Sequence, residues 1–252
     1  MGAPTLEKFL RKGRPTDVRQ LVVCAGDSVT QGVASANWVG PLQDQLGSRG
    51  YLFVRAGWGG YLSHSLLREL DSVIACRPDA VVVMIGTNDV MATMDDAWRD
   101  SYARQDLPEI PTIETYRSWL EQIVVRLLAD TSARVALLDL PPIGEDLGST
   151  FNQRVGAFNE VIRAVAVEHG VEVLPLNDRL TEIIRASSDA PPFDGTTKEI
   201  KSALLQRFLL RRRWDRIAAR AGRVVLTDNI HLTDRAGREV AALVREFVED
   251  AP

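Results

Sequence analysis

The chain has 252 residues, of which 45% are hydrophobic, so it is long enough to bury the core of one large α/β domain. Its formal net charge of −4 and its few, scattered aromatic residues argue against a nucleic-acid-binding protein. No apolar run approaches the length of a membrane-spanning helix, so we expect no stable membrane insertion.

The N-terminal sequence and the cysteines indicate where the protein works. The first fifteen residues contain no apolar signal-peptide core, so the simplest expectation is a cytoplasmic protein, although a mature secreted chain would look the same. Cys24 and Cys76 are the only cysteines, and the sequence has no CxxC or Cys/His cluster. We therefore expect reduced, buried thiols and neither a metal nor an organic cofactor.

Hydrophobic periodicity predicts a regular alternation of strands and helices after a charged arm at 1–19, in which 5–12 forms a helical turn. The expected strands are 21–26, 51–56, 80–86, 134–140 and 171–176. The expected helices are 38–48, 63–75, 113–129, 151–169, 197–220 and 233–249. The continuous apolar run AVVVMIG at 80–86 is typical of a central parallel strand that is buried on both faces.

This order predicts a three-layer α/β/α sandwich around a mainly parallel, five-stranded sheet. We expect a single domain at 20–252, with insertions near 91–111 and 187–220. No internal repeat is evident. The sequence leaves the oligomeric state open.

The stretch VVCAGDSVTQG at 22–32 carries the first candidate for chemistry. A strand ends there in a small-residue turn that holds Ser28, at the edge of the sheet where open α/β folds place their active sites. A serine hydroxyl is a poor nucleophile until a base takes its proton. A histidine must therefore come from elsewhere in the chain.

Three histidines are available. His169 precedes a glycine at the predicted end of a helix, where a cation is favoured, and His64 has no carboxylate near it in sequence. His231 follows Asp228 by three positions, a spacing that lets one turn bring the carboxylate to the imidazole. Alone, such a pair is more often a chance surface pair, but together with Ser28 it indicates a Ser-His-Asp triad.

Four blocks in this order resemble the SGNH, or GDSL-type, hydrolases. The blocks are GDSVTQG at 26–32, GWGG at 57–60, GTND at 86–89 and DNIH at 228–231. The resemblance covers about residues 21–248 and implies the flavodoxin-like SGNH hydrolase fold.

The resemblance also implies roles for single residues. Ser28 would be the nucleophile, and Asp228 and His231 would complete the triad. Ser28, Gly60 and Asn88 would form the oxyanion hole, with Gly57 and Gly59 as neighbouring candidates for the second position. The chain departs from the family pattern in having Arg55 where asparagine is common and Tyr61 where an acidic residue is common.

The GWGG block admits a second interpretation, as part of a dinucleotide-binding fingerprint. Gly57 and Gly59 fit G-x-G, but Leu62 occupies the third glycine position, so this interpretation fails on spacing. Ordinary turn chemistry is the alternative for Asn88 and Asp89 after their strand.

The insertions hold the candidates for substrate recognition. Trp98, Tyr102, Met91 and Met94 either line an acyl or sugar pocket or pack the 91–111 segment down. The other candidate substrate contacts are Asp27, Trp58 and Asp89.

The 197–220 segment has a basic face that would serve either as a solvated surface or as a lid or arm for an anionic head group, a lipid surface or a partner. Its basic residues are Arg207, Arg211, Arg212, Arg213 and Arg216, and its packing residues are Leu204, Leu205, Leu209 and Ile217. We favour the solvated surface.

These features predict a serine hydrolase, an esterase or lipase that cleaves acyl or acetyl esters of small molecules through an acyl-enzyme intermediate. Two alternatives use the same scaffold, an acyltransferase and a carbohydrate or natural-product deacetylase. A non-catalytic binding protein is less favoured, because every motif residue is present. GDSVT lacks the second glycine of G-x-S-x-G, which excludes the α/β-hydrolase nucleophile elbow.

Overall fold

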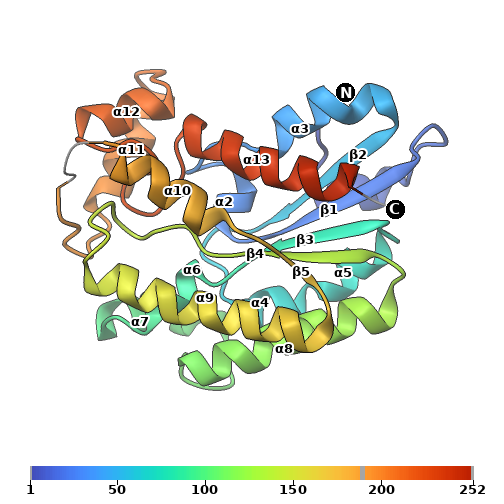
Figure 1. The fold of residues 1–252 in the computed structure, drawn as a ribbon, viewed down its shortest axis with the longest axis horizontal. Helices are drawn as coiled ribbons and strands as arrows, with labels where there is room; N and C mark the ends of the chain where they lie inside the picture. The colour runs from blue at the N-terminus through green and yellow to red at the C-terminus, as the bar shows by residue number, and fades with distance from the viewer. Residues whose placement is uncertain (1, 188–190, 251–252) are drawn as a thin grey trace.

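A computed structural model describes residues 2–187 and 191–250 of the chain. Five parallel strands form one sheet in the order β2-β1-β3-β4-β5, with helices on both faces (Figure 1). The strands are β1 (Gln20–Gly26), β2 (Tyr51–Gly57), β3 (Ala80–Met84), β4 (Arg134–Leu138) and β5 (Glu172–Leu174). The predicted three-layer sandwich is confirmed.

Apolar residues of β1 alternate between the two faces of the sheet, as a strand buried on both sides requires. One hydrophobic cluster takes Leu21 and Val23, and the other takes Val22 and Cys24. The first cluster is covered by α1 (Leu6–Lys12), α4 (Ser63–Arg68), α5 (Leu70–Ala75), α6 (Thr87–Ala92), α8 (Ile113–Asp130) and α9 (Thr150–His169). The second is covered by α3 (Val39–Leu46), α10 (Leu176–Arg185) and α13 (Asp234–Glu249).

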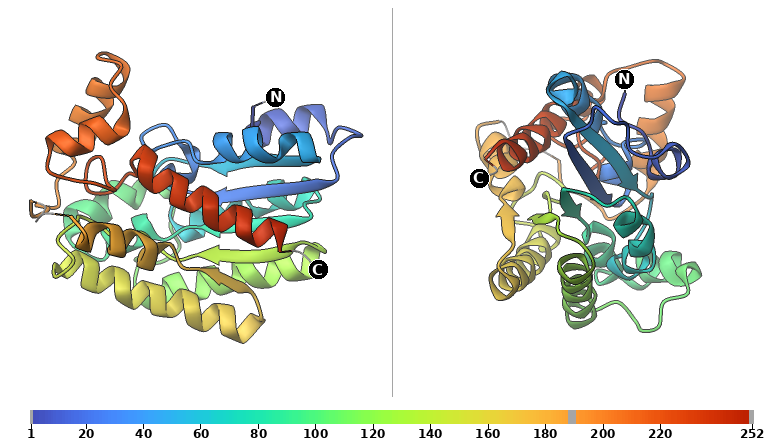
Figure 2. Two further views of the ribbon diagram at one scale, coloured as in Figure 1. Left: turned by 45° about the horizontal axis from the view of Figure 1, so that its top comes forward. Right: turned by 90° about the vertical axis from the view of Figure 1, so that its right-hand side faces the viewer.

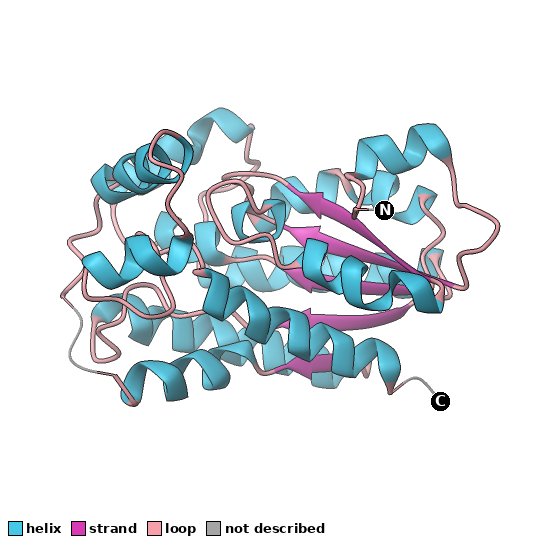
Figure 3. Cartoon of the chain, turned by 90° about the horizontal axis from the view of Figure 1, so that it is seen from above, coloured by secondary structure: helices cyan, strands magenta, loops and turns pink. Residues whose placement is uncertain are grey.

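The remaining helices surround the carboxyl ends of the strands, where the arrowheads in Figure 3 lie. They are α2 (Ser28–Gln31), α7 (Asp96–Tyr102), α11 (Lys198–Phe208) and α12 (Trp214–Arg220), with a short 3₁₀ turn at Ala103–Gln105 after α7. A second 3₁₀ turn, Gly47–Arg49, lies at the other end of the sheet, between α3 and the start of β2. The chain leaves β1 toward β2 on one side and leaves β3 toward β4 on the other, so the loops after the adjacent strands β1 and β3 diverge at the carboxyl edge of the sheet. This is the edge at which a doubly wound sheet binds its ligand.

The N-terminal segment lies against the free edge of β2. The N–H of Arg55 donates to the carbonyl of Pro4, and Thr5 forms a parallel bridge with Arg55. Leu6 and Phe9 of α1 are buried in the same cluster as the first strand. Residues 4–9 therefore cover an edge strand and part of the core.

Three expected elements are corrected by the structure. The helix expected over 63–75 is two helices, because hydrogen bonding tightens to i→i+3 at Glu69. The strand expected to reach 176 ends at Leu174, since Pro175 has no N–H to donate, and Leu176 begins α10, a helix that the sequence analysis did not predict.

The helix expected over 197–220 is also two helices. They are separated by a turn in which Arg211 takes the left-handed φ of 50°. Leu205 and Leu209, expected to pack, are exposed, whereas Ile217 is buried and Leu204 is partly buried. Both cysteines are free and buried, as expected.

Candidate active site

Ser28, His231 and Asp228 come together at the carboxyl edge of the sheet. Ser28 is the first residue of α2, two residues after the end of β1, and its Oγ lies 3.0 Å from Nε2 of His231. The other ring nitrogen, Nδ1, lies 2.9 Å and 3.1 Å from the two carboxylate oxygens of Asp228. Nδ1–H therefore donates to the carboxylate and leaves Nε2 free to accept the serine proton.

The turn from Asp228 to His231 is fixed by its own hydrogen bonds. Asp228 accepts the backbone N–H groups of Ile230 and His231, and Asn229 between them has a left-handed φ of 74°. Asparagine tolerates this conformation better than most residues. The turn accounts for the three-residue spacing that the sequence displayed.

Electrostatics in this pair make the imidazole of His231 a stronger base. Burial lowers the pKa of His231, but the carboxylate of Asp228 attracts the imidazolium and raises the pKa above its usual range overall. Burial alone would raise the pKa of Asp228, but the positive charge of His231 outweighs this effect, so the pKa of Asp228 lies below its usual range. The carboxylate is thus ionised and able to stabilise the proton that His231 receives.

Asp27 closes the N-terminus of α2. Its side chain accepts the N–H of Val29 at 2.9 Å, and burial raises its pKa to about 6 against the opposing effects of that N–H and of His231. Ser28 is thereby held at the first turn of a capped helix, where its N–H is one of the groups without an acceptor inside the helix.

Gly57 and Gly60, in the glycine-rich turn after β2, have different surroundings. A Cβ on Gly57 would lie 2.3 Å from the backbone nitrogen of Gln31, so this glycine allows β2 to pack on α2. Gly60 has a left-handed φ of 78° and no neighbour within 4 Å of a Cβ, and its carbonyl accepts the side chain of Gln105 at 2.7 Å. Among the alternatives left open by the sequence, Gly60 is the one that faces open space.

Asn88 lies at the start of α6, and its amide has a fixed orientation. Its Nδ2 donates to the carbonyl of Tyr61 at 2.9 Å and lies 3.5 Å from Asp27, while its Oδ1 accepts the hydroxyl of Tyr102 at 2.8 Å. Tyr102 belongs to α7 in the 91–111 segment and is buried. Of the four pocket candidates in that segment, Tyr102 and Met91 therefore pack inward.

The remaining candidate contacts differ in their surroundings. Asp89 is buried and accepts the N–H and hydroxyl of Ser63, and burial raises its pKa to about 7. Trp58 stacks on Tyr61 with ring centroids 5.3 Å apart. Trp98 donates from Nε1 to the carbonyl of Gly195 at 2.6 Å, so the two insertions meet here.

Two buried charged residues that the sequence analysis missed hold the loop before Asp228. The carboxylate of Glu145 accepts the N–H groups of Val224, Val225 and Leu226. Arg223 donates to the carbonyl of Thr227 at 2.9 Å and lies 2.5 Å from Glu199 in the first turn of α11. The sequence offered one indication of these roles, the position of Glu145 shortly after the strand predicted over 134–140.

The other histidines lie outside this arrangement. His64 stacks on Trp119, with ring centroids 5.2 Å apart, and His169 is the last residue of α9, as expected. His169, Glu121 and Glu168 are close enough to share an ion, but Arg117 already binds both carboxylate oxygens of Glu168. Within 2–187 and 191–250, this is the one cluster with metal-ligand spacing.

The parallel sheet, its strand order and the helical layers define this chain as an α/β protein with the SGNH hydrolase architecture. Residues 24–238 match the sequence model of the GDSL-like Lipase/Acylhydrolase family. The chain belongs to this family and is a carboxylic ester hydrolase.

Solved structures show the same fold at low sequence identity. Axe2, an acetylxylan esterase from Geobacillus stearothermophilus, is 15% identical with a TM-score of 0.66, over 93% of this chain and 96% of Axe2. The acetyl xylan esterase AlAXEase is 20% identical with a TM-score of 0.61, over 90% and 99% of the two chains. A lipase/acylhydrolase from Enterococcus faecalis is 18% identical with a TM-score of 0.61, over 91% and 95%. No curated protein matches the chain in sequence.

Proposed function

We propose that the chain hydrolyses small carboxylic esters with Ser28 as nucleophile, His231 as general base and acid, and Asp228 as the residue that orients His231. One observation carries the proposal, the continuous path from Oγ to Nε2 at 3.0 Å and from Nδ1 to the carboxylate at 2.9 Å. This path gives the serine proton an acceptor and gives the resulting imidazolium a counter-charge.

In the first half-reaction Ser28 Oγ forms a bond to the ester carbonyl carbon, and its proton passes to Nε2 of His231. The tetrahedral intermediate collapses, His231 returns the proton to the leaving alcohol, and the acyl group stays on Ser28. In the second half, water attacks the acyl-enzyme, its proton passes to His231, and collapse releases the acid as Oγ regains a proton.

The oxyanion of both intermediates needs hydrogen-bond donors. We assign this role to the N–H groups of Ser28 and Gly60 and to the side-chain amide of Asn88. Support comes from the first-turn position of Ser28, the open space at Gly60 and the fixed orientation of the Asn88 amide. Losing one donor of this kind typically costs about 3 kcal/mol of transition-state stabilisation.

The test measures hydrolysis of p-nitrophenyl esters from acetyl to palmitoyl by the wild type and Ser28→Ala. We expect the wild type to be active and the variant to lose activity, and a fluorophosphonate to label Ser28. Because similar folds occur in acetylxylan esterases, the acetyl ester and acetylated xylooligosaccharides come first in the series. Equal activity of wild type and variant would refute Ser28 as the nucleophile.

The same assay separates hydrolase from transferase. Added alcohols or sugars compete with water for the acyl-enzyme, so an acyltransferase would form a new ester in preference to free acid. Wild type that neither hydrolyses any ester nor reacts with the fluorophosphonate would favour a binding protein.

A further inference from the structure

The 197–220 segment differs in charge from the rest of the molecule. It holds eight basic and two acidic residues, a formal charge of +6, in a chain whose net charge is −4. All other residues together therefore carry −10. A strong local excess of one sign indicates a surface that meets the opposite charge.

Most of these positive charges have no carboxylate partner. Of the six arginines between 207 and 220 in the described chain, only Arg213 lies within 4.0 Å of a carboxylate, that of Asp234 at 3.9 Å. The pKa of Arg212 is lowered by loss of surrounding water and by the positive charges of Arg220 and Arg216. The arginines thus repel one another and are not neutralised within the described part of the chain.

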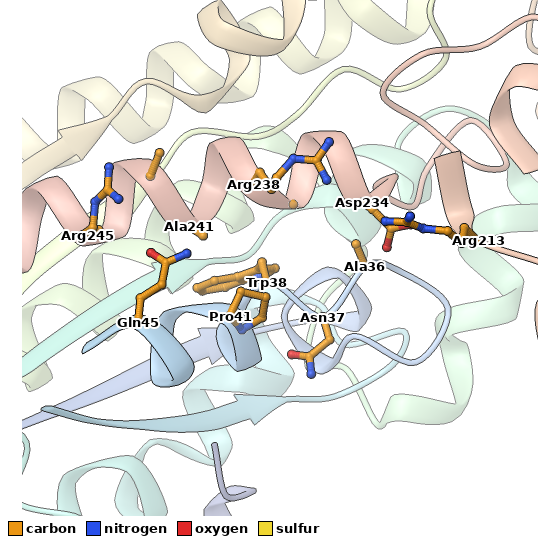
Figure 4. A pocket seen from close by; sticks show the side chains of 12 residues that line it. Ala36, Asn37, Trp38, Pro41, Gln45, Arg213, Asp234, Arg238, Ala241 and Arg245 are labelled. Carbon is orange, nitrogen blue, oxygen red and sulfur yellow. The ribbon is translucent and has the colours of Figure 1, made fainter. Parts of the chain in front are cut away.

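The arginines beside a neighbouring groove, unlike those near the end of α11, have carboxylate partners. A hollow of about 450 Å³ lies between α3 and α13, with Trp38 at its floor (Figure 4). The arginines along α13 on its rim are paired, Arg238 with Asp215 at 3.9 Å and Arg245 with Glu249 at 3.7 Å. The groove therefore offers an anionic ligand less free positive charge than the end of α11 does.

Exposed apolar side chains accompany the unpaired arginines. Leu205, Phe208, Leu209 and Leu210 are 58%, 61%, 71% and 51% exposed. The first three share one face of α11 at i, i+3 and i+4. The helix packs through other residues, since Ala203 and Leu204 lie in a small cluster with Trp214 and Ile217. Internal packing does not explain the exposed residues.

The placement of this surface suits a planar partner. The helical pair α11–α12 stands out from the body of the molecule in the left view of Figure 2. Apolar side chains bordered by arginines match the acyl boundary and the phosphates of a bilayer, respectively. No helix in the described ranges is long and apolar enough to cross a membrane.

We propose that the end of α11 and the following turn, residues 205–213, dock the protein on an anionic phospholipid surface. A nucleic acid would use the arginines but not four exposed aliphatic and aromatic side chains. A second copy joined through the same surface would bring like charges together. The proposal stands independently of the assigned ester hydrolysis.

The test is co-sedimentation with vesicles of phosphatidylglycerol mixed with phosphatidylcholine, beside vesicles of phosphatidylcholine alone. We expect binding to the anionic vesicles only, and weaker binding at high salt because exposed charges are screened. The double variant Phe208→Ser/Leu209→Ser should bind at least about tenfold more weakly, because it removes buried apolar area from the contact. Arg211→Gln, which removes an exposed charge from the same turn, should weaken binding and reduce its salt dependence.

Matched controls come from α9. Val167 is 83% exposed and Arg154 is exposed, so Val167→Ser and Arg154→Gln remove the same kinds of group from another surface. Both should bind vesicles like the wild type, and all variants should hydrolyse a soluble ester at the wild-type rate.

Two results would overturn the proposal. One is equal vesicle binding by the wild type and Phe208→Ser/Leu209→Ser. The other is no binding of the wild type to the anionic vesicles. A dimer in solution that the variant dissociates would then assign the surface to a second copy, and duplex-DNA binding that the variant leaves intact would assign it to a nucleic acid.

Discussion

Replacing Tyr102 by phenylalanine removes one hydroxyl and keeps the buried ring. That hydroxyl donates to Oδ1 of Asn88 at 2.8 Å, so its loss leaves the amide oxygen without its partner and the amide held only from its nitrogen, by the carbonyl of Tyr61. A lost hydrogen bond of this kind costs about 1–3 kcal/mol, which corresponds to roughly 5- to 150-fold in kcat if the transition state bears all of it. We expect Tyr102→Phe to lower kcat within this range.

A double-mutant cycle tests whether Tyr102 acts through Asn88. We expect Asn88→Ala alone to lower kcat by on the order of a hundredfold or more, and Tyr102→Phe to have no further effect in that background. Tyr116→Phe is the matched control, because the hydroxyl of this buried tyrosine donates to the carbonyl of Ile85 at 3.0 Å. It should lower the free energy of unfolding comparably and leave kcat near the wild-type value. Additive losses in kcat in the double variant would refute the reasoning.

Three other predictions concern the residues around this centre. Because Asp228 raises the pKa of His231, kcat/KM of the wild type should rise with pH through a midpoint above 6.5. Asp228→Asn should lower this midpoint and should also lower kcat by several orders of magnitude. An unmoved midpoint in the pH profile of the variant would contradict this reasoning. Glu145→Ala should lower the free energy of unfolding in urea by a few kcal/mol, because three N–H groups, two of them buried, lose their acceptor. Glu145→Gln, which keeps one oxygen, should cost less, and equal losses would argue against the acceptor role. Burial raises the pKa of Asp89 from 3.8 to about 7, so the folded state holds this proton more tightly than the unfolded chain does. The protonated group therefore adds to the free energy of unfolding below about pH 4, and this contribution is lost as the pH rises through 7. Between those pH values the wild type should lose at most about 4 kcal/mol of unfolding free energy through this group. Asp89→Asn should flatten this decline, and parallel declines in the two proteins would show that Asp89 is not its cause.

The sequence was most informative where structure depends on local pattern. The apolar run at 80–86 predicted the central strand β3, and the spacing of Asp228 and His231 predicted a turn that the structure contains. The division of the 197–220 segment into two helices was not predictable in this way, since neither proline nor glycine marks the turn at Arg211. Helix propensity alone favours a continuous helix through those residues.

The contacts that support the site escaped prediction for a different reason, although Tyr102 itself was named as a pocket or packing residue. Tyr102, Glu145 and Arg223 reach Asn88 and the Asp228 loop from elements that are distant in sequence or carry no motif. Their partners are mostly backbone groups, which leave no side-chain signature. Only the assembled sheet edge brings these groups together.

The pairing of Pro4 and Thr5 with Arg55 has a consequence for shortened forms of the protein. Because these residues cover the otherwise open side of β2, a chain lacking 1–19 would present unpaired strand groups and the apolar surface that Leu6 and Phe9 now cover. Exposed strand edges recruit other chains. We expect such a truncation to aggregate during refolding, although the four motif blocks all lie outside the deleted part.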